Sequence, residues 1–478
     1  MLVANGVAGD SRVQKTAWSM ADAGWRVTLI GRAAGAQIER FASKGAQVVL
    51  VPVPKIVSGY ERSRLRRSGT GAGGRARRAA YRAARAQLAA RDARTGGGRR
   101  SAAAAAVRGW LDRHQGTDLV VGRLAAGPVG GSARIALAGV LGILDRRGGW
   151  RRFNPWFADL EIAMAPVVAE SRPDLIHAHD FHMVGIGARL AADLSTPGHP
   201  VRWIYDAHEY LAGIDLPKRH DLRRRLRRRM LVGVEREYIG RADAVVTVSE
   251  GIATRLARDH RLAARPAVVL NAPVIGSQGS KRRLRDDAGV DEQTPLLLYS
   301  GGMSPRRGVA TVIDALAALA DAGAHLALIA RDEDPDVAAL RRRAQERGVT
   351  ARVHVLPYVP VDEVVPYIES ATIGVVPILH RPNHELSLIT KYFEYLHACL
   401  PIVTSDVREM AETTRRLGVG EVFAAGDADS LARAVRAVLA DLDAYRKVYA
   451  GPDDPRGASR WERQAATLDA VYRGVLAQ

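Results

Sequence analysis

The chain has 478 residues, of which 47% are apolar and only 5% aromatic, so it is long enough to bury two or three domain cores. Its one cysteine, Cys399, excludes an intrachain disulfide and a cysteine-based zinc cluster, and favours a reducing compartment. No N-terminal run resembles a signal peptide, and the apolar stretch at 135–144 is far shorter than the roughly 20 residues that cross a bilayer. We therefore expect a cytoplasmic protein that is not integral to a membrane.

The net charge of +19 is concentrated in one part of the chain. Residues 61–113 hold 15 arginines and three acids, and the segment at 218–230 adds more basic residues. Two interpretations stay open: a solvated arginine-rich face, or a peripheral contact with anionic lipid at the inner face of a membrane. The first segment has only Tyr81 and Trp110 as aromatics, which argues against base stacking, so we expect no nucleic acid as a partner.

Short β-branched runs alternate with helical patterns along the rest of the chain. The runs are continuously apolar, which is typical of strands covered on both faces in a parallel α/β sheet. They are RVTLIGR, QVVLVPV, DLIHAHD, RWIYDAHE, ADAVVTVSE, AVVLNAP, PLLLYSGG, HLALIARD, RVHVLPY, IGVVPIL and LPIVTSD.

These runs are too many for one doubly wound sheet, and the Pro/Gly/Ser-rich stretch 271–289 divides them. We therefore predict an α/β protein with two Rossmann-like domains that face each other across a cleft. The predicted parts are an N-terminal domain (1–270, with a basic insert at about 56–150), a linker (271–289), a C-terminal domain (290–457) and a terminal amphipathic helix (458–478).

In open α/β sheets ligands bind at the carboxyl ends of strands, so the loops that follow strands are the candidate sites. The first is a glycine-containing loop after the short run MLVA, followed by a helix that Asp10 can N-cap. Arg12 and Lys15 then lie in the first turns of that helix. They are either substrate contacts or solvated basic residues.

Two further strands end in polar residues. We expect His177 and His179 to point to opposite faces of their strand, which would prevent a shared metal site. His179, at the strand end, is better placed as a hydrogen-bond donor to a polar substrate. The next strand ends in the same way and places Asp206, His208 and Glu209 near the cleft edge.

The segment YSGGMSPRRGV at 299–309 has the features of a phosphate site. Gly301 and Gly302 let the backbone approach a ligand closely, and the helix that follows offers free N–H groups and a partial positive charge. Arg306 or Arg307 can add a full charge. Glycine turns between strand and helix are common, so the motif alone is weak evidence.

A lysine and a glutamate begin the helix in TKYFEYLHA at 390–398. Lys391 in the first turn and Glu394 one turn on would face a ligand that arrives over the strand end. The two oxygens of a carboxylate match two neighbouring sugar hydroxyls. The alternative is a surface salt bridge, which contributes less than about 1 kcal/mol.

Together these segments resemble the GT-B glycosyltransferases, specifically the large retaining family 4 that uses nucleotide-diphosphate sugars. The resemblance is carried by DSRVQKTAWSMADAGWRVTLIGR, PDLIHAHD, ADAVVTVSEGIATRL, YSGGMSPRRGV and ELSLITKYFEYLHACLPIVTSDVREM, in this order. It covers nearly the whole chain except the basic insert, and the terminal helix resembles one that crosses back to the N-terminal domain. It implies transfer of a hexosyl or N-acetylhexosaminyl group, with retention, to a glycan, lipid-linked or small-molecule acceptor in polysaccharide or glycoconjugate biosynthesis.

The resemblance also implies roles for individual residues. The catalytic residues would be His179, Arg307 and Lys391. The donor-binding residues would be Gly301, Gly302, Arg306, Glu385 and Glu394, with Glu394 on the ribose hydroxyls. The acceptor side would hold Asp10, Arg12, Lys15, His208 and Glu209. No metal and no cofactor is expected, because the cations and the helix N-terminus can neutralise the leaving diphosphate.

Some positions depart from the family pattern. Leu386 stands where the family has its first glutamate, one position from Glu385, and Thr390 follows Ile389 where relatives have Pro-Asn. Cys399 replaces a glycine. A nucleotide-sugar epimerase, an inactive relative and an arginine-rich nucleic-acid-binding protein are the alternatives.

Overall fold

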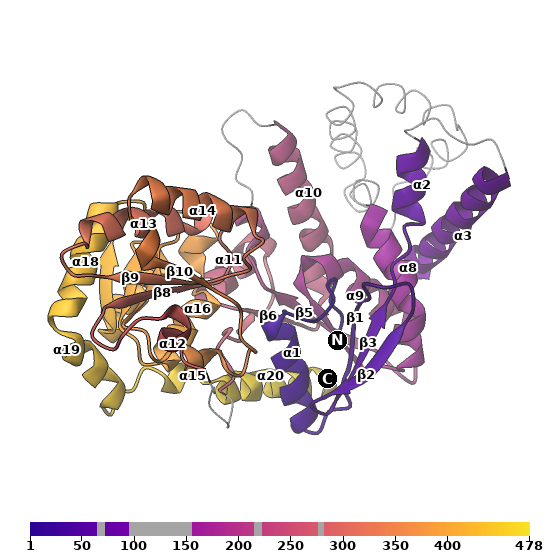
Figure 1. Ribbon diagram of the computed structural model, residues 1–478. Helices are drawn as coiled ribbons and strands as arrows, with labels where there is room; N and C mark the ends of the chain where they lie inside the picture. Colours follow the sequence, from indigo (N-terminus) through magenta and orange to yellow (C-terminus); the bar gives the residue numbers. More distant parts are fainter. Residues whose placement is uncertain (65–71, 95–154, 215–221, 276–281) are drawn as a thin grey trace. The chain divides into compact units, whose positions relative to one another are not determined.

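The computed structural model describes residues 1–64, 72–94, 155–214, 222–275 and 282–478 (Figure 1). These residues form two compact units. Unit 1 comprises Met1–Thr247, Ala253–Ala267 and Leu468–Gln478, and unit 2 comprises Val248–Ile252 and Val268–Thr467. Much of the predicted insert, and parts of the linker and of the basic segment 218–230, lie outside the described residues.

Unit 1 is built on one sheet. Its strands are β1 (Thr28–Arg32), β2 (Glu39–Ser43), β3 (Ala46–Val51), β4 (Leu175–His179), β5 (Arg202–Ala207), β6 (Ala244–Thr247) and β7 (Ala267–Val268), in the orders β1-β3-β2 and β4-β5-β6-β7. Leu2 joins the two parts, because it bridges Ile30 of β1 and Ala178 of β4. β2 pairs antiparallel with β3, whereas β1 with β3 and β4 with β5 pair in parallel.

The helices of this half of the chain are α1 (Ser11–Asp22), α2 (Val57–Arg64), α3 (Ala72–Arg94), α8 (Pro155–Glu170), α9 (Asp180–Leu194), α10 (Leu222–Tyr238) and α11 (Glu250–His260). The described part of the insert is anchored to the domain. Asp159 of α8 accepts hydrogen bonds from the first amides of α2, Val57 N at 2.7 Å and Ser58 N at 3.2 Å. Arg91 of α3 binds Glu161 Oε1 at 3.0 Å and Asp193 Oδ2 at 2.8 Å. Within the described ranges, no helix combines the length and apolar character needed to cross a bilayer.

Unit 2 is a doubly wound parallel sheet. Its strands are β8 (Leu296–Ser300), β9 (His325–Ile329), β10 (Val353–Leu356), β11 (Ile373–Val376), β12 (Ile402–Ser405) and β13 (Gly420–Phe423), in the order β10-β9-β8-β11-β12-β13. The helices are α12 (Leu284–Ala288), α13 (Val309–Ala318), α14 (Pro335–Glu346), α15 (Val364–Ile368), α16 (Thr390–His397), α17 (Arg408–Leu417), α18 (Ala428–Ala440), α19 (Leu442–Lys447) and α20 (Trp461–Leu476). The last residues of α20 belong to unit 1.

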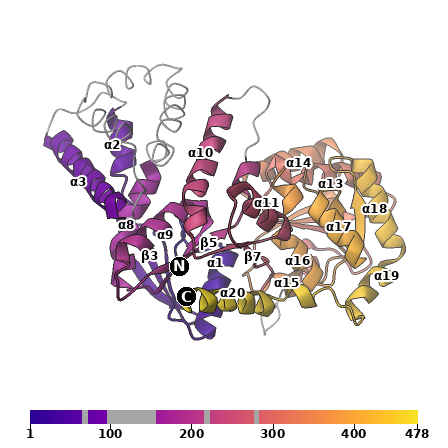
Figure 2. The ribbon, with the colours of Figure 1, turned by 180° about the vertical axis from the view of Figure 1, so that it is seen from behind.

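Helices cover both faces of the sheet in unit 2 (Figure 2). Leu297 and Tyr299 of β8 pack with α13, α14 and α18, whereas Leu296 and Leu298 pack with α12, α15 and α16. Burial on both faces explains the continuous apolar runs in the sequence. Each of the apolar runs from RVTLIGR to LPIVTSD contains an observed strand, and β2 and β13 were not expected. The very short strand expected at MLVA is only an isolated bridge at Leu2.

Candidate active site

A buried carboxylate, Asp206, organises the polar side chains at the strand ends of unit 1. It lies at the end of β5, directly opposite His179 of β4 in the parallel register. Arg12 binds it with two hydrogen bonds, Nε to Oδ2 and Nη2 to Oδ1, both 2.9 Å long. Three imidazole nitrogens also face Asp206 Oδ2: His179 Nδ1 at 3.2 Å, His208 Nε2 at 3.4 Å and His177 Nε2 at 3.7 Å.

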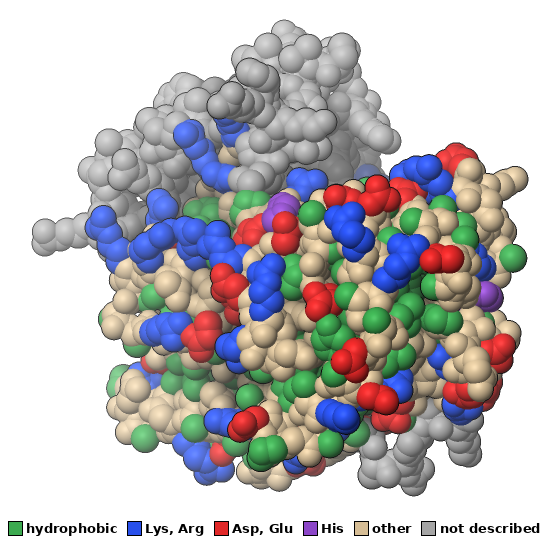
Figure 3. Space-filling model, turned by 90° about the vertical axis from the view of Figure 1, so that its left-hand side faces the viewer, with side chains coloured by type: hydrophobic (Ala, Val, Ile, Leu, Met, Phe, Trp, Pro, Cys, Tyr) green, Lys and Arg blue, Asp and Glu red, His purple; other side chains and the backbone are tan. Residues whose placement is uncertain are grey.

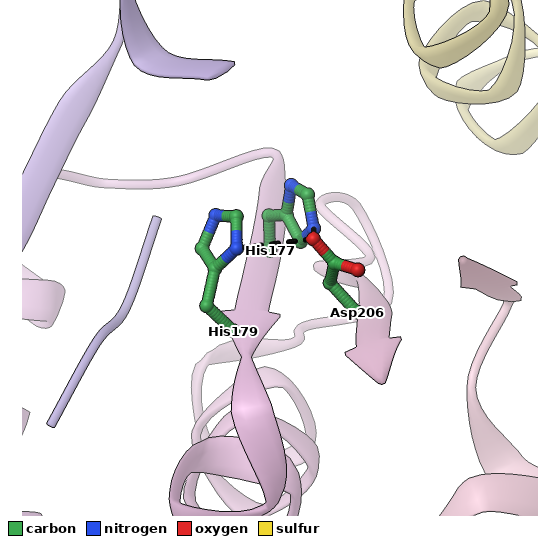
Figure 4. A group of neighbouring side chains, drawn as sticks. All are labelled: His177, His179 and Asp206. Atoms are coloured by element: carbon green, nitrogen blue, oxygen red, sulfur yellow. Dashed lines mark ion pairs between the residues drawn. The ribbon is translucent and has the colours of Figure 1, made fainter. Parts of the chain in front are cut away.

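His177 and His179 lie on the same face of β4, contrary to our sequence expectation. Residues two apart along a strand share a face, because successive side chains alternate. The two rings stack with centroids 4.0 Å apart, and both turn toward Asp206 on the neighbouring strand (Figure 4). The expectation was wrong because only directly neighbouring residues of a strand point to opposite faces, and these two histidines are two positions apart.

The charges of this cluster are fixed by its neighbours. Burial alone would raise the pKa of Asp206, but the Arg12 guanidinium and the imidazoles hold it well below its usual value. Burial lowers the pKa of His177, and burial together with His177 lowers the pKa of His179 well below its usual value. Burial also opposes a charge on His208, but Asp206 outweighs it and raises the pKa. The site therefore holds an ionised carboxylate and two neutral imidazoles.

His177, His179 and Asp206 could offer three metal-ligand atoms within 4.8 Å of one another. A metal ion would have to share Asp206 with Arg12, whose guanidinium already supplies the neutralising cation at 2.9 Å. Placing a second cation there costs Coulomb energy in a buried, low-dielectric site. The residues therefore fit a metal poorly, and the absence of a metal requirement stays a prediction.

The other acceptor-side residues lie on the same unit. Asp10 is the N-cap of α1 and accepts a hydrogen bond from Val13 N at 3.2 Å, which confirms the predicted cap. Arg12 and Lys15 are only 4% and 1% exposed, so the alternative of solvated basic residues was wrong. Glu209, after β5, is exposed.

In unit 2, the loop after β8 and the first turn of α16 bring the donor-side residues together. Lys391 is buried, and its Nζ lies 4.6 Å from the ring centroid of Tyr299 at the end of β8. Gly301 has a φ of 115°, and a Cβ there would come within 2.8 Å of Lys391 Nζ. The glycine is needed both for its backbone conformation and to leave room for the ammonium group.

The turn that carries Arg306 and Arg307 follows this loop, and a close approach between two backbone segments restricts its conformation. Pro305–Arg307 form one 3-10 turn, in which Arg306 is exposed and Arg307 half-buried. At Gly308, the N-cap of α13, a Cβ would lie 1.8 Å from Pro377 O. Leu379 N donates to Arg306 O at 3.2 Å, which ties this turn to the loop after β11. The N-terminus of α13 thus follows directly after the two arginines.

The surroundings of Lys391 bring the pKa of its ammonium group close to neutral pH. Burial, and then the nearby Arg307, lower its pKa to about 7, although Glu394 opposes the shift. Glu394, one turn along α16, is half-buried, and Ser300 Oγ lies 3.5 Å from its Oε2. Because Lys391 is buried, the interpretation of Lys391 and Glu394 as a surface salt bridge was wrong.

Glu385 is engaged by protein groups. It lies in the 3-10 turn His384–Leu386, where its Oε1 is 2.6 Å from His380 Nδ1 and its Oε2 accepts from Arg408 N at 2.9 Å. His380 Nε2 contacts Asp406 Oδ1 at 2.9 Å, so one imidazole bridges two carboxylates. The arrangement gives Glu385 a role in holding this loop, and a direct role on the donor stays a prediction.

The sequence interpretation placed Asp206 near the cleft edge but did not predict its contacts with Arg12 and the histidines. It missed Tyr299, His380 and Asp406 as partners of the predicted residues. A signal for the contact of Asp206 with the histidines was present. A histidine and an aspartate that end adjacent parallel strands meet at one sheet edge, and the same-face pair His177 and His179 marks that edge. No local pattern indicated the bridge formed by His380.

Two family models match the chain. Residues 294–441 match the model described as Glycosyl transferases group 1, and residues 133–274 match the model described as Glycosyltransferase Family 4. Together the matches span more than half of the chain, and they include His179 and Asp206 of unit 1 and Arg307, Lys391 and Glu394 of unit 2. The chain belongs to these glycosyltransferases.

Solved structures with this fold resemble the glycosyltransferase over most of its length. Sucrose-phosphate synthase from Thermosynechococcus elongatus has a TM-score of 0.64 at 15% identity, with 100% of this chain and 98% of that chain covered. A UDP-forming trehalose-phosphate synthase from Burkholderia xenovorans, solved with glucose-6-phosphate, has a TM-score of 0.57 at 13% identity, with 99% of each chain covered. These likenesses show that the glycosyltransferase has the predicted GT-B fold.

A curated relative matches in part. The 2-deoxystreptamine glucosyltransferase of Streptomyces kanamyceticus is 25% identical over 223 residues, which is 45% of this glycosyltransferase and 56% of the relative. The match therefore spans little more than half the length of the relative. Anabaena HepE in complex with UDP-glucose is 16% identical, with a TM-score of 0.52 over 66% of this chain and 83% of that chain.

Proposed function

We propose that the protein transfers a sugar from a nucleotide-diphosphate sugar to an acceptor hydroxyl, with retention of the anomeric configuration. The observation that carries the proposal is the buried Lys391, held between Tyr299 and Gly301 beside the Arg307 turn. A buried ammonium whose pKa is lowered to about 7 is unfavourable without an anion to neutralise it. A diphosphate supplies that anion.

The groups around Lys391 suit a leaving diphosphate. Negative charge builds on the diphosphate as the bond to the sugar breaks, and fixed donors aimed at that charge lower the barrier. The N-terminus of α13 adds a partial positive charge next to Arg307, and arginine offers two parallel donors to phosphate oxygens. The departing phosphate can then deprotonate the acceptor on the same face of the sugar, so no protein base is required.

The carboxylate of Glu394 is assigned to the ribose. It lies one helical turn from Lys391 and close to Ser300 at the end of β8, so a nucleotide whose diphosphate meets Lys391 can place its ribose there. HepE was solved with UDP-glucose and the trehalose-phosphate synthase is UDP-forming, which favours a uridine nucleotide as the first donor to test.

Nucleotide binding tests the proposed donor site. We expect one of UDP, GDP, ADP or TDP to bind in calorimetry, and Arg307→Ala to weaken that binding about tenfold to a hundredfold, because a charged hydrogen bond contributes about 1.5–3 kcal/mol. Arg342→Ala, an exposed arginine of α14, is the matched control. Equal affinity of both variants for the nucleotide would contradict the assignment of Arg307.

The lowered pKa of Lys391 gives a pH-dependent expectation. At about pH 8 the free site is mostly neutral, and a bound diphosphate raises the pKa of the ammonium, so binding should take up close to one proton. At about pH 6 the uptake should be small. Calorimetry in two buffers of different ionisation enthalpy measures this number, and Lys391→Met should abolish the proton uptake at about pH 8, where the phosphates of the free nucleotide are fully ionised.

We also propose a peripheral contact with anionic lipid, through the basic helices of unit 1. Arg77, Arg78 and Arg82 are exposed on α3, and Arg225 and Arg229 are exposed on α10. Both helices pack against α9. Elsewhere charges of both signs are interspersed over the described surface drawn in Figure 3. A protein bound to the membrane surface through α3 and α10 would be able to reach a lipid-linked acceptor.

Vesicle co-sedimentation tests the contact. Each exposed arginine near an anionic surface contributes about 1 kcal/mol, so changing Arg77, Arg78 and Arg82 together to glutamine should greatly reduce binding to phosphatidylglycerol vesicles. The control removes three exposed arginines of unit 2: Arg342, Arg433 and Arg463. Equal binding to phosphatidylcholine vesicles, or equal loss in both triple variants, would remove the proposal.

A further inference from the structure

We propose that Tyr472, on the C-terminal helix α20, is a positioning residue that sets the orientation of His179 through His177. Tyr472 is 4% exposed, and its hydroxyl lies 2.5 Å from His177 Nδ1. His177 stacks on His179 at 4.0 Å, and both rings face Asp206. The proposal rests on the proposed sugar transfer, because His179 is the member of this chain expected near the transferred sugar.

The ionised Asp206 determines which nitrogen of His177 carries the proton. Arg12 keeps the carboxylate charged, so a nitrogen that faces it must present a hydrogen rather than a lone pair. His177 Nε2 lies 3.7 Å from Asp206 Oδ2, too far for a hydrogen bond, and the charge of the carboxylate favours the tautomer with the proton on this nitrogen. The other nitrogen, Nδ1, is then an acceptor, and the Tyr472 hydroxyl donates to it.

The same argument gives the state of His179. Its Nδ1 lies 3.2 Å from Asp206 Oδ2 and donates to it, so its Nε2 is left with a lone pair. Among the described atoms, this buried Nε2 has no hydrogen-bond partner. A buried acceptor without a partner is costly unless a ligand supplies the donor. A hydroxyl of the transferred sugar is the donor that the proposed reaction provides.

The chain end is held where this contact requires it. Trp25, after α1, donates from Nε1 to Asp469 Oδ1 at 2.7 Å, and its ring meets the ring of Tyr472 edge to face at 5.6 Å. Asp469 lies one turn before Tyr472 on α20. Tyr472, on the last helix, thus supplies the hydrogen-bond partner of His177 Nδ1. Without the hydroxyl of Tyr472, this buried nitrogen would have no partner among the described residues.

Tyr472→Phe removes the hydroxyl and keeps the ring. We expect kcat for sugar transfer to fall about tenfold while the KM for the donor stays within twofold, because one neutral hydrogen bond is lost and the nucleotide contacts lie on unit 2. Asp469→Ala is the matched control, since it removes the neighbouring anchor of α20 without touching His177. A kcat equal to that of the wild type in Tyr472→Phe, or an equal loss in both variants, would overturn the proposal.

Nitrogen-15 spectra of labelled histidine show which nitrogens of His177 and His179 are protonated, and they test the role of Tyr472 independently of activity. In the wild type we expect a protonated Nδ1 and an unprotonated Nε2 for His179, and the reverse pattern for His177. In Tyr472→Phe the His177 signals should change or broaden, whereas in Asp469→Ala they should not. Unchanged His177 signals in Tyr472→Phe would contradict the proposal. If the wild type transfers no sugar, the proposed function fails and the spectra still decide the role of Tyr472.

Discussion

Lys391→Met should lower kcat by about 10²–10³ while the protein stays folded. Methionine fills the space of the lysine stem between Tyr299 and Gly301 but carries no charge. Removing one preorganised donor aimed at developing negative charge costs about this factor in other enzymes. The measurement is the initial rate of nucleoside diphosphate release at a saturating donor concentration.

Lys447→Met, an exposed lysine in α19, is the control for this substitution and should keep the wild-type rate. Thermal melting of both variants separates lost catalysis from lost folding. A Lys391→Met enzyme with full kcat and only a raised KM would show that Lys391 binds the substrate and transition state equally, which contradicts its assigned role.

Asp206→Asn should destabilise the protein by about 3–5 kcal/mol, because it leaves the buried Arg12 without its counter-ion. Glu170→Gln is the matched control, since it breaks an exposed ion pair with Arg40 that contributes less than about 1 kcal/mol. Urea unfolding gives both values. Equal losses of unfolding free energy in the two variants would contradict the account of the unit 1 cluster.

The same carboxylate predicts the direction of a pH effect. The pKa of Asp206 is well below its usual value in the folded protein, so its contribution is fully present above the unfolded pKa of about 4. Stability should be lost as the pH falls below that value and through the folded pKa. Asp206→Asn should show a flatter stability profile in this acid range.

Much of the fold followed from the sequence because buried parallel strands leave continuous apolar runs. β2 was missed since its residues ERFAS are mostly exposed and pair antiparallel at a sheet edge. Cys399 illustrates a different case: it has a φ of 53°, in the left-handed region that favours glycine. The family glycine at this position therefore has a backbone reason, and here a cysteine adopts the same conformation.

The sequence predicted individual residues of the site but not the contacts between them. Strand ends and glycine turns pointed to His179, Gly301, Arg307 and Lys391. The contacts that give these residues their chemistry join positions far apart in the chain, as Tyr472 joins His177. Such pairings depend on tertiary packing, and no local spacing encodes them.

Sugar transfer itself is tested most directly by incubating the protein with UDP-, GDP-, ADP- and TDP-sugars and measuring nucleoside diphosphate release and the fate of the sugar. We expect one donor to be consumed, with the sugar transferred to an acceptor or to water, and we expect Glu394→Ala and Arg307→Ala to abolish the reaction. Consumption without transfer, yielding an epimerised sugar, would favour the epimerase. No release from any donor, or full rates in both variants, would contradict the proposed site.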